Sequence, residues 1–359
     1  MVQSTSPVLL IINPGSTSTK LAGYGGWTEL FAVDVVHDWR ALDALGAVAA
    51  QEDLRYDLVK QTLAEHAEEC SRLAAVIGRG GLLRPLSGGV YRVSEKMLAE
   101  LRAATYGEHA SNLGAILAAR VAADFGIPAF IADPVVVDEL LPEARLSGMP
   151  ELERKSIFHA LNHKSVARRV AADLGRQVQD LNLIVAHLGG GISVAAHCRG
   201  RVIDVNNALD GDGPFSPERA GGVPSGQLAR LVNSGQFTLA EIQRKLCGKG
   251  GVVAYLGTKD MAEVARRVAA GDSRAQLVFN ALVHQVAKEI GAMATVLAGK
   301  VDAIVLTGGL AHLEPFTAAL SQKVSFIAPI RIIPGEREML ALAENAMAAL
   351  TGTSPILEY

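Results

Sequence analysis

Cysteine is scarce in this 359-residue sequence, and its three cysteines, Cys70, Cys198 and Cys247, are widely spaced. An odd number of cysteines, with no pair at metal-ligand spacing, argues against a disulfide framework and against a zinc site. The first apolar run, 8–12, has no basic flank and is too short for a secretion signal. No run approaches the roughly 18 residues of a membrane helix. We therefore expect a cytoplasmic protein with no membrane partner.

Charge is also low and nearly balanced. The sequence has 34 Lys and Arg against 37 Asp and Glu, a formal net charge of −3, and charged residues make up only 20%. Because 49% of the residues are hydrophobic, the chain as a whole is not disordered. No block of Lys and Arg could neutralise a phosphate backbone, so we expect no nucleic-acid partner. The length suits two or three domains.

Several nucleotide and catalytic motifs are missing. The sequence lacks G-x-x-x-x-G-K-[ST], a strand-borne G-x-G-x-x-G that opens a helix, the protein kinase signatures and G-x-S-x-G. These absences argue against a P-loop enzyme, a dinucleotide-binding domain, a protein kinase and a serine hydrolase.

Glycine, by contrast, is abundant: 36 of 359 residues, about 10% against a usual value of roughly 7%. Short apolar runs bounded by Gly or Pro predict buried strands at 8–12, 74–77, 128–131, 183–187, 304–307 and 331–333. Helical periodicity predicts helices over 94–104, 111–125, 155–174, 239–247, 260–270 and 275–297. This alternation is typical of the α/β class.

A weak internal repeat accompanies the glycines. The strand at 8–12 and the strand at 183–187 each run into a loop of small residues and then into a returning strand, which predicts two similar domains. A third glycine turn follows the strand at 304–307. For any one of these turns, a simple link between strands is an equally good explanation. Three such turns at strand ends favour phosphate binding by backbone N–H groups.

The order of motifs resembles the acetokinase family, which comprises the acetate and butyrate kinases. The matching blocks run through the whole chain, at 13–20, 79–81, 132–134, 156–162, 187–191, 214–222, 248–251, 307–309 and 334–338. The blocks Ile-Phe-His-Ala-Leu-Asn and Pro-Phe-Ser-Pro-Glu-Arg resemble the butyrate kinase branch in particular. This resemblance implies two ribonuclease H-like domains of the actin-like ATPase type with a cleft between them.

The resemblance also implies where the two domains begin and end and which reaction the protein catalyses. Residues 1–149 would form an N-terminal domain, joined by a C-terminal helix at 340–359. Residues 150–339 would bind ATP and carry the contacts of a homo-oligomer, a dimer or larger. The implied reaction converts MgATP and butyrate, or a similar C3–C5 acid, into ADP and an acyl phosphate, reversibly and by direct in-line transfer. A carboxylate with a pKa of about 4 is already ionised, so cations matter more than a general base.

Two arginines flanked by glycines are the candidate charge clamp. Taken alone, such an arginine is more often part of a surface ion pair, but the resemblance assigns Arg79 to the substrate carboxylate and Arg219 to the transferred phosphoryl group. It also assigns Asp133, which could equally be a simple turn residue, to metal or water positioning. Asn13 and Glu338 would lie near Mg²⁺, with Glu336 as the alternative to Glu338.

The remaining candidates follow from the same blocks. His159 and His187 would line the path of the phosphoryl group, although a lone histidine at a strand end is usually structural, and the role of His109 stays open. ATP would be bound by residues on two loops and two glycine turns: Asn13, Ser16, Ser18, Lys20, Gly189, Gly190, Gly191, Asp260, Gly308 and Gly309. Phe158 and Gly81 would contact the acid. Gly81 replaces a bulky aliphatic residue of the acetate branch, which predicts room for two or three additional methylenes.

Two other functions share this fold class. A nucleotide-binding regulatory or chaperone-like protein needs no pair of arginines beyond the γ-phosphate, so Arg79, Arg219 and Asp133 together favour the enzyme. A sugar kinase needs a base to deprotonate a hydroxyl and several polar sugar contacts, and no such motif is evident. Fold alone does not separate these functions.

Overall fold

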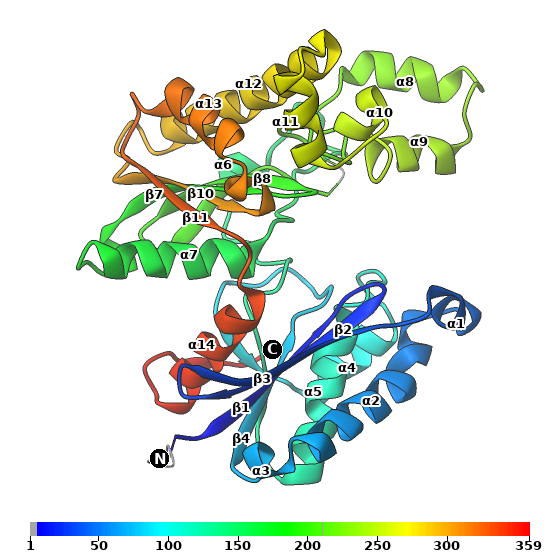
Figure 1. The fold of residues 1–359 in the computed structure, drawn as a ribbon, viewed down its shortest axis with the longest axis vertical. Coiled ribbons are helices and arrows are strands. Elements are labelled where there is room, and N and C mark those ends of the chain that lie inside the picture. The colour runs from blue at the N-terminus through cyan, green and yellow to red at the C-terminus, as the bar shows by residue number, and fades with distance from the viewer. Residues whose placement is uncertain (1–5, 210) are drawn as a thin grey trace. The chain divides into compact units, whose positions relative to one another are not determined.

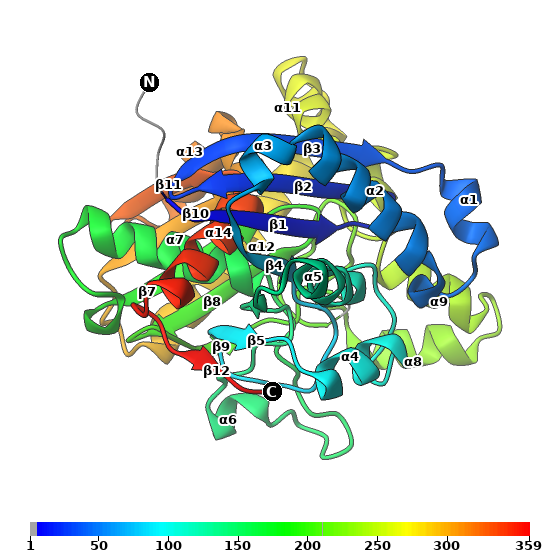
Figure 2. The same ribbon diagram turned by 90° about the horizontal axis from the view of Figure 1, so that it is seen from below.

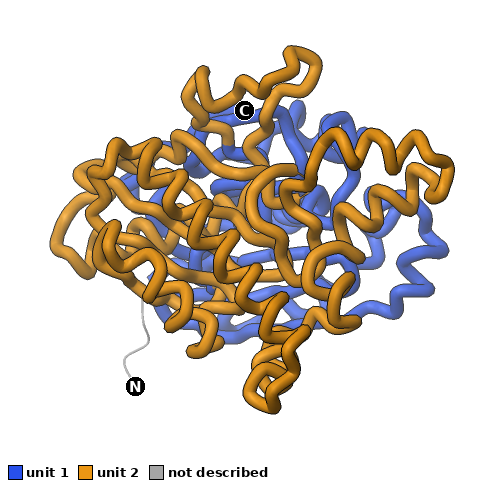
Figure 3. The backbone as a smooth tube through the Cα atoms, turned by 90° about the horizontal axis from the view of Figure 1, so that it is seen from above, with its two compact units in different colours: residues 1–137, 337–359 blue, residues 138–336 orange. Residues whose placement is uncertain are grey.

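The chain forms two compact units in the computed structural model, which describes residues 6–209 and 211–359 (Figure 3). Unit 1 takes the chain up to Val137 and again from Arg337 to Tyr359, and unit 2 is Asp138–Glu336. The division expected after residue 149 therefore lies inside unit 2. The reason is local anchoring: Leu141 N–H donates to the Ile203 carbonyl (3.0 Å), and the Lys164 ammonium binds the Glu139 carboxylate (2.7 Å).

Unit 1 is built on a mixed sheet. Its strand order, among the described residues, is β12-β5-β6-β4-β1-β2-β3. The strands are β1 (Val8–Pro14), β2 (Ser18–Gly25), β3 (Thr28–Val36), β4 (Leu73–Arg79), β5 (Val90–Arg92), β6 (Ala129–Ala132) and β12 (Ile356–Leu357). The predicted hairpin is present, because β1 pairs antiparallel with β2, and Figure 2 shows β1, β2 and β3 side by side.

Helices cover both faces of this sheet. Helix α5 packs on β4 and β1 from one face and α14 packs on the same strands from the other (Figure 1), so every residue of β1 is buried. The helices of unit 1 are α1 (Trp39–Ala44), α2 (Glu52–Glu65), α3 (Ala67–Cys70), α4 (Glu95–Arg102), α5 (Asn112–Phe125) and α14 (Glu338–Leu350). Ser94 caps the start of α4, because its Oγ accepts from the Met97 N–H (3.3 Å).

Close contact between α5 and β4 fixes the end of that strand. A Cβ on Gly114 would lie 2.9 Å from the Arg79 backbone nitrogen, and a Cβ on Gly78 would lie 2.9 Å from that of Ala115. Both positions therefore need glycine, because real side chains do not tolerate such distances. The contact sets Arg79 at the carboxyl end of β4, directly beside the N-terminal turn of α5.

Unit 2 repeats the topology of unit 1. Its described strands lie in the order β11-β10-β7-β8-β9, and they are β7 (Asn182–Leu188), β8 (Ile192–Cys198), β9 (Arg201–Val205), β10 (Ala303–Gly308) and β11 (Ile330–Pro334). The pairings are parallel, parallel, antiparallel and antiparallel, and the run β6-β4-β1-β2-β3 of unit 1 shows the same series. The predicted internal repeat is thus confirmed as a repeat of strand order.

The helices of unit 2 again cover both faces of their sheet, with α7 on β7 and β10 and α12 on β8 and β7. They are α6 (Pro142–Arg145), α7 (Ala160–Asp173), α8 (Ser225–Asn233), α9 (Leu239–Leu246), α10 (Val252–Leu256), α11 (Met261–Ala269), α12 (Ser273–Val296) and α13 (Glu314–Val324). The helix predicted over 155–174 begins only at Ala160, because the Ile157 carbonyl accepts from Ala208 N–H (2.9 Å) and holds the preceding chain in an irregular path. None of the described helices is long and apolar enough to cross a membrane.

Candidate functional site

A carboxylate is held by an arginine fork at the strand ends of unit 1. Arg79 Nη2 lies 3.0 Å from Glu338 Oε1, and Arg79 Nη1 donates to Glu338 Oε2 (3.1 Å). Asn13 Nδ2 donates to the same Oε2 atom (2.8 Å), and its own Oδ1 accepts from Arg79 Nη1 (3.3 Å). The structure therefore brings together Asn13, Arg79 and Glu338, which come from β1, β4 and the first turn of α14. Such a two-point contact is the strongest geometry between a guanidinium and a carboxylate.

The alternative glutamate, Glu336, lies elsewhere. It is the last residue of unit 2, its carbonyl accepts from Asn162 Nδ2 (2.9 Å), and its carboxylate lies 3.5 Å from His187 Nε2. Glu338 is therefore the acidic partner of Asn13 and Arg79. Spacing in the sequence alone does not decide between two glutamates that are two residues apart.

Backbone strain marks two positions near this fork. Asp133 follows β6 with a φ of 40°, and Arg337 precedes Glu338 with a φ of 44°. The left-handed region disfavours residues with a side chain, and such positions concentrate at functional sites. Asp133 is buried, and its Oδ1 accepts from the Gly89 N–H (2.8 Å). The left-handed backbone therefore occurs at Asp133 itself and at the residue directly before Glu338.

Oxygen donors in unit 1 suit magnesium. Asp133 and Glu338 offer carboxylates and Asn13 offers an amide oxygen, which are the hard ligands that Mg²⁺ prefers. Within the described part of the chain, no group of three or more His, Cys, Asp or Glu side chains could enclose a metal. Mg²⁺ usually keeps several waters and is shared between one or two carboxylates and substrate phosphates, so it does not require such a group. The donor set therefore fits a metal that arrives with a nucleotide.

His109 has a defined tautomer beside Arg79. The Ser111 N–H donates to His109 Nδ1 (3.2 Å), so the neutral ring carries its proton on Nε2. Burial, followed by the positive charge of Arg79, lowers the pKa of His109. His109 is consequently a neutral hydrogen-bond donor near the arginine fork, a placement that the sequence leaves open.

The predicted ATP-binding side chains in the loop after β1 and in the first residues of β2 differ in their exposure to solvent. Ser16 is exposed, Ser18 is half-buried at the start of β2, and Lys20 is half-exposed with its ammonium 3.8 Å from Asp34 on β3. An ion pair with Asp34 is the contact that the structure gives Lys20. The assignment of these three residues to ATP stays a prediction.

Gly81 does not open the space that its missing side chain suggests. A Cβ at this position would lie 2.6 Å from the Asn112 Cα and 2.9 Å from the Asn112 backbone nitrogen. The start of α5 therefore fills the volume, and Asn112 Oδ1 also accepts from the Leu82 N–H (2.8 Å). The argument that Gly81 makes room for additional methylenes is wrong in its physical premise, because the glycine serves helix packing.

A cluster of histidines occupies unit 2. The rings of His159 and His187 stack with centroids 3.7 Å apart, and Ser193 Oγ links His159 Nδ1 (2.9 Å) to His163 Nε2 (2.8 Å). The edge of buried Phe158 meets His163 with ring centroids 5.1 Å apart. Sequence reasoning identified His159 and His187 but missed Ser193 and His163. Spacing offered one signal, because residues 159 and 163 are four apart at the start of a helix.

Asn162 fixes the protonation of His187. Asn162 Nδ2 donates to the Glu336 carbonyl, so its Oδ1 is the atom 2.8 Å from His187 Nδ1 and must accept a proton from it. His187 is buried, and its Nε2 therefore carries a lone pair unless the ring is charged. Only as an imidazolium does His187 donate from Nε2.

Arg219 is held by a backbone carbonyl and a serine hydroxyl, and none of the described residues uses its buried Nε. Its Nη1 donates to the Ala208 carbonyl, and its backbone N–H donates to Ser216 Oγ (3.1 Å). Arg219 Nε is buried and finds no acceptor among the described residues. Such an orphaned cationic donor suits an anionic ligand. Gly191 lies directly against this guanidinium, so a Cβ at position 191 would overlap it.

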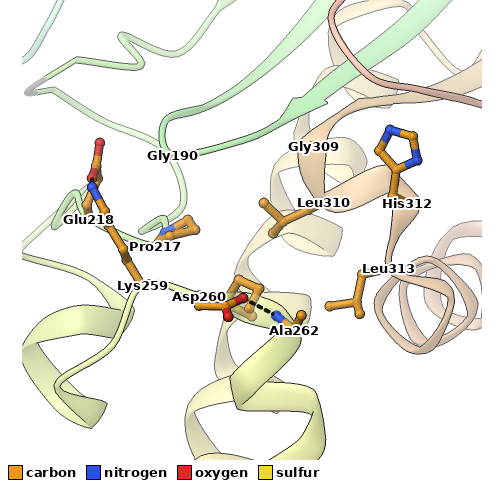
Figure 4. A pocket seen from close by; sticks show the side chains of 11 residues that line it. Gly190, Pro217, Glu218, Lys259, Asp260, Ala262, Gly309, Leu310, His312 and Leu313 are labelled. Atoms are coloured by element: carbon orange, nitrogen blue, oxygen red, sulfur yellow. Dashed lines mark hydrogen bonds and ion pairs between the residues drawn. The ribbon is translucent and has the colours of Figure 1, made fainter. Parts of the chain in front are cut away.

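A cavity of about 520 Å³ lies within unit 2 (Figure 4). Three predicted ATP-binding residues line it: Gly190, Asp260 and Gly309. Asp260 also caps α11 by accepting from the Ala262 N–H (2.9 Å). Residues outside the predicted set complete the wall, namely Pro217, the Glu218–Lys259 ion pair (2.7 Å), Met261, Ala262, Leu310, His312 and Leu313. The cavity thus combines apolar surface with charged groups at one side.

Two of the predicted glycines, Gly308 and Gly189, shape the turns at the ends of β10 and β7. Gly308 has a φ of 86°, and a Cβ there would lie 2.6 Å from the Leu188 carbonyl oxygen, so this residue ends β10 beside β7. The Gly189 N–H donates to the Gly191 carbonyl (3.1 Å) and closes the turn between β7 and β8. The turn between β7 and β8 contains Gly190, the turn after β10 contains Gly309, and both of these glycines line the cavity.

Comparison with known proteins decides the family. The family model described as "Acetokinase family" matches residues 150–319. Butyrate kinase 2 of Clostridium acetobutylicum is 52% identical over 351 residues, covering 98% of this chain and 99% of the relative. The chain belongs to the acetokinase family. A probable butyrate kinase of Listeria monocytogenes is 50% identical with the same coverage.

Solved structures show the same architecture for this acetokinase. The crystal structure of acetate kinase from Porphyromonas gingivalis superposes with a TM-score of 0.79 at 18% identity, covering 96% of this chain and 100% of that one. The α/β class and the two similar actin-like ATPase domains expected from the sequence are therefore confirmed. At this identity, the likeness is evidence for the fold alone.

Proposed function

We propose that this acetokinase is a butyrate kinase, which transfers the γ-phosphoryl group of MgATP to butyrate or a similar C3–C5 acid and yields ADP and the acyl phosphate reversibly. The observation that carries the proposal is the Arg79 fork, which already binds a carboxylate at two points. The relatives at about half identity over nearly the whole chain carry the butyrate kinase name, which supports the same substrate class.

On the acid side, Arg79 would hold the substrate. For the guanidinium, a substrate carboxylate is chemically equivalent to the carboxylate of Glu338, so the fork suits either one. The neutral Nε2–H of His109 supplies a further donor beside it. Asn13, Asp133 and Glu338 would hold Mg²⁺, which when bound offsets the charge of the nucleotide phosphates.

On the nucleotide side, unit 2 offers separate surfaces for base and phosphates. Leu310, Leu313 and Met261 give the cavity an apolar wall suited to the adenine ring, and the Asp260 carboxylate can accept from ribose hydroxyls. The turns at Gly189–Gly191 and Gly308–Gly309 would approach the phosphates with backbone N–H groups. Their glycines permit that approach because no Cβ stands in the way.

The transfer itself needs charge stabilisation more than proton transfer. One oxygen of the ionised acid attacks the γ-phosphorus, the bond from that phosphorus to the ADP oxygen breaks, and ADP leaves with the electron pair. The substrate carboxyl has no proton to lose at neutral pH. Arg219 Nε is a donor available for the transferred group, because it has no acceptor among the described residues.

A hydroxylamine trap tests the proposal directly. Purified protein, MgATP, butyrate and hydroxylamine should yield butyryl hydroxamate, and omission of Mg²⁺ should abolish it. Absence of any hydroxamate with C2–C6 acids would refute the enzyme class. Comparison of kcat/KM for acetate, propionate, butyrate and valerate tests the chain length, and an optimum at acetate would contradict the C3–C5 preference. Gel filtration tests the proposed homo-oligomer.

A further inference from the structure

Unit 1 buries a positive charge that no carboxylate compensates. Arg55, on α2, has no exposed surface. Its Nε and Nη2 donate to Gln51 Oε1 (3.1 and 2.8 Å), its Nη1 donates to Thr19 Oγ1 and to the Ser18 carbonyl (2.9 Å each), and its Nη2 also reaches the Ser16 carbonyl (3.5 Å). All these acceptors are neutral oxygens, and no carboxylate of the described residues forms an ion pair with Arg55.

Such a charge is unusual in a protein interior. Burying an ionised group without an opposite charge is expensive, and proteins normally pair it. The acids at the start of the same helix are committed elsewhere, because Glu52 binds Arg102 and Arg120, and Asp53 binds Arg120. Burial lowers the pKa of Arg55 to about 10, which still leaves it charged at neutral pH. The unit therefore keeps a buried cation that has no carboxylate in ion-pair contact among the described residues.

The contacts of Arg55 point to where an anion would bind. The two carbonyls it holds, those of Ser16 and Ser18, belong to the turn between β1 and β2, which the Gly15 N–H closes on the Ser18 carbonyl (2.8 Å). In a trans peptide, C=O and N–H point in opposite directions, so the N–H of Thr17 points away from Arg55. Ser16 and Thr17 are exposed, and in the described part of the chain their N–H groups have no acceptor.

We propose that Arg55 is a positioning residue: its buried charge, held in place by Gln51, shapes the turn at 15–18 and attracts a phosphoryl group to the exposed N–H groups of Ser16 and Thr17. The proposal rests on the proposed kinase function and adds a residue that lies under the phosphate loop and does not touch the substrate. The phosphoryl group is the missing counter-ion, and oriented amides backed by a cation are an effective anion site.

The Gln51→Glu variant tests the charge of Arg55 separately from the hydrogen bonds that hold its side chain. It keeps both hydrogen bonds to Arg55 and the side-chain volume, but it places a carboxylate against the guanidinium and cancels its field at the turn. We expect the KM for ATP to rise roughly ten-fold, as the loss of one unit charge about 10 Å away produces at an effective dielectric constant near 20. The melting temperature should stay the same or increase, because the two contacts become charge-assisted.

Gln61→Glu is the matched control. Gln61 lies on the same helix, is exposed and binds Glu65 (2.8 Å), so the change alters net charge equally without approaching Arg55. Its KM for ATP should match that of the wild type. In Arg55→Lys, which keeps the charge but loses the fork, the KM should rise less than in Gln51→Glu, while the melting temperature falls.

The outcomes separate this inference from the function itself. If wild-type protein forms butyryl hydroxamate and Gln51→Glu retains the wild-type KM for ATP, the inference is wrong and the kinase assignment stands. A loss of melting temperature and kcat in Gln51→Glu at an unchanged KM would likewise assign Arg55 a purely structural role. If wild-type protein forms no hydroxamate with any acid, the proposed function itself fails.

Discussion

Gly191 and Arg219 offer a way to displace a proposed catalytic arginine without removing it. A Cβ on Gly191 would overlap the Arg219 guanidinium, lying 2.6 Å from its Cζ and 3.1 Å from the Ala208 carbonyl oxygen. Gly191 lies outside the positive-φ region, so alanine is compatible with its backbone. The overlapping atoms are the far end of a flexible side chain. In Gly191→Ala the arginine should therefore move while the fold is kept.

The expected magnitude follows from that displacement. Since Cβ atoms keep at least about 3 Å from other heavy atoms, the guanidinium must shift by about 1 Å, and a misplacement of that size costs on the order of 100-fold in rate. The substitution removes some freedom of the unfolded chain, worth about 0.4–1 kcal/mol, which partly offsets the crowding. We expect kcat to fall roughly 30- to 100-fold, with the melting temperature within a few degrees of wild type.

The assay is hydroxamate formation at saturating butyrate and variable MgATP, with thermal unfolding measured in parallel. Gly222→Ala is the control. Its Cβ would lie 3.5 Å from the Gly213 carbonyl oxygen and 3.8 Å from the Gly213 nitrogen, which are ordinary contacts, in the loop that follows Arg219. Arg219→Ala gives the reference loss, which should appear mainly in kcat. A wild-type kcat in Gly191→Ala, or a loss equal to that of Gly222→Ala, would refute the placement of Arg219 at the reacting group.

Two further predictions concern packing and acidity. Gly81→Val should destabilise unit 1 by about 1–3 kcal/mol through overlap with Asn112 and leave the order of preferred acids unchanged; a stable variant with a preference for shorter acids would contradict this. Burial lowers the pKa of His197 from 6.5 to about 3, so between these values the unfolded chain binds a proton that the folded protein does not. The wild type should lose about 2 kcal/mol from this histidine between pH 7 and pH 5, and urea unfolding of His197→Gln should show a correspondingly weaker pH dependence.

Local patterns located several of the strands and helices. Apolar runs located β1, β4, β6, β7 and β10, because strands in the middle of a sheet covered on both faces must be apolar along their length. The run at 331–333 also located β11, although this strand lies at the edge of its sheet and is partly exposed. The repeat of strand, small-residue loop and strand predicted two similar sheets, because each copy begins with a buried apolar strand. The helix at 155–174 was extended too far, since apolar periodicity does not show that a backbone contact from Ala208 holds the chain before Ala160.

The sequence motifs identified residues of the site, but they did not show which of these side chains contact one another. Matching motifs selected Asn13, Arg79 and Glu338, but only the meeting of β1, β4 and α14 shows that one carboxylate receives both other side chains. The same holds for Ser193, which joins two histidines from another element. These contacts link residues far apart in the chain, and no local pattern encodes them.

Composition indicated a glycine-rich chain with a balanced charge, no disulfide framework and no basic patch, and the alternation of apolar runs with helical periodicity indicated the α/β class. Resemblance in the order of its motifs determined the family. Tertiary structure decided what each glycine and cation does. Gly81 packs against the start of α5, Gly191 lies against the Arg219 guanidinium, and Arg55 is buried without a carboxylate partner among the described residues. The physical reason is that a glycine or an arginine has the same local signature wherever it lies, and only its neighbours in space determine whether it admits a ligand, a side chain or a charge.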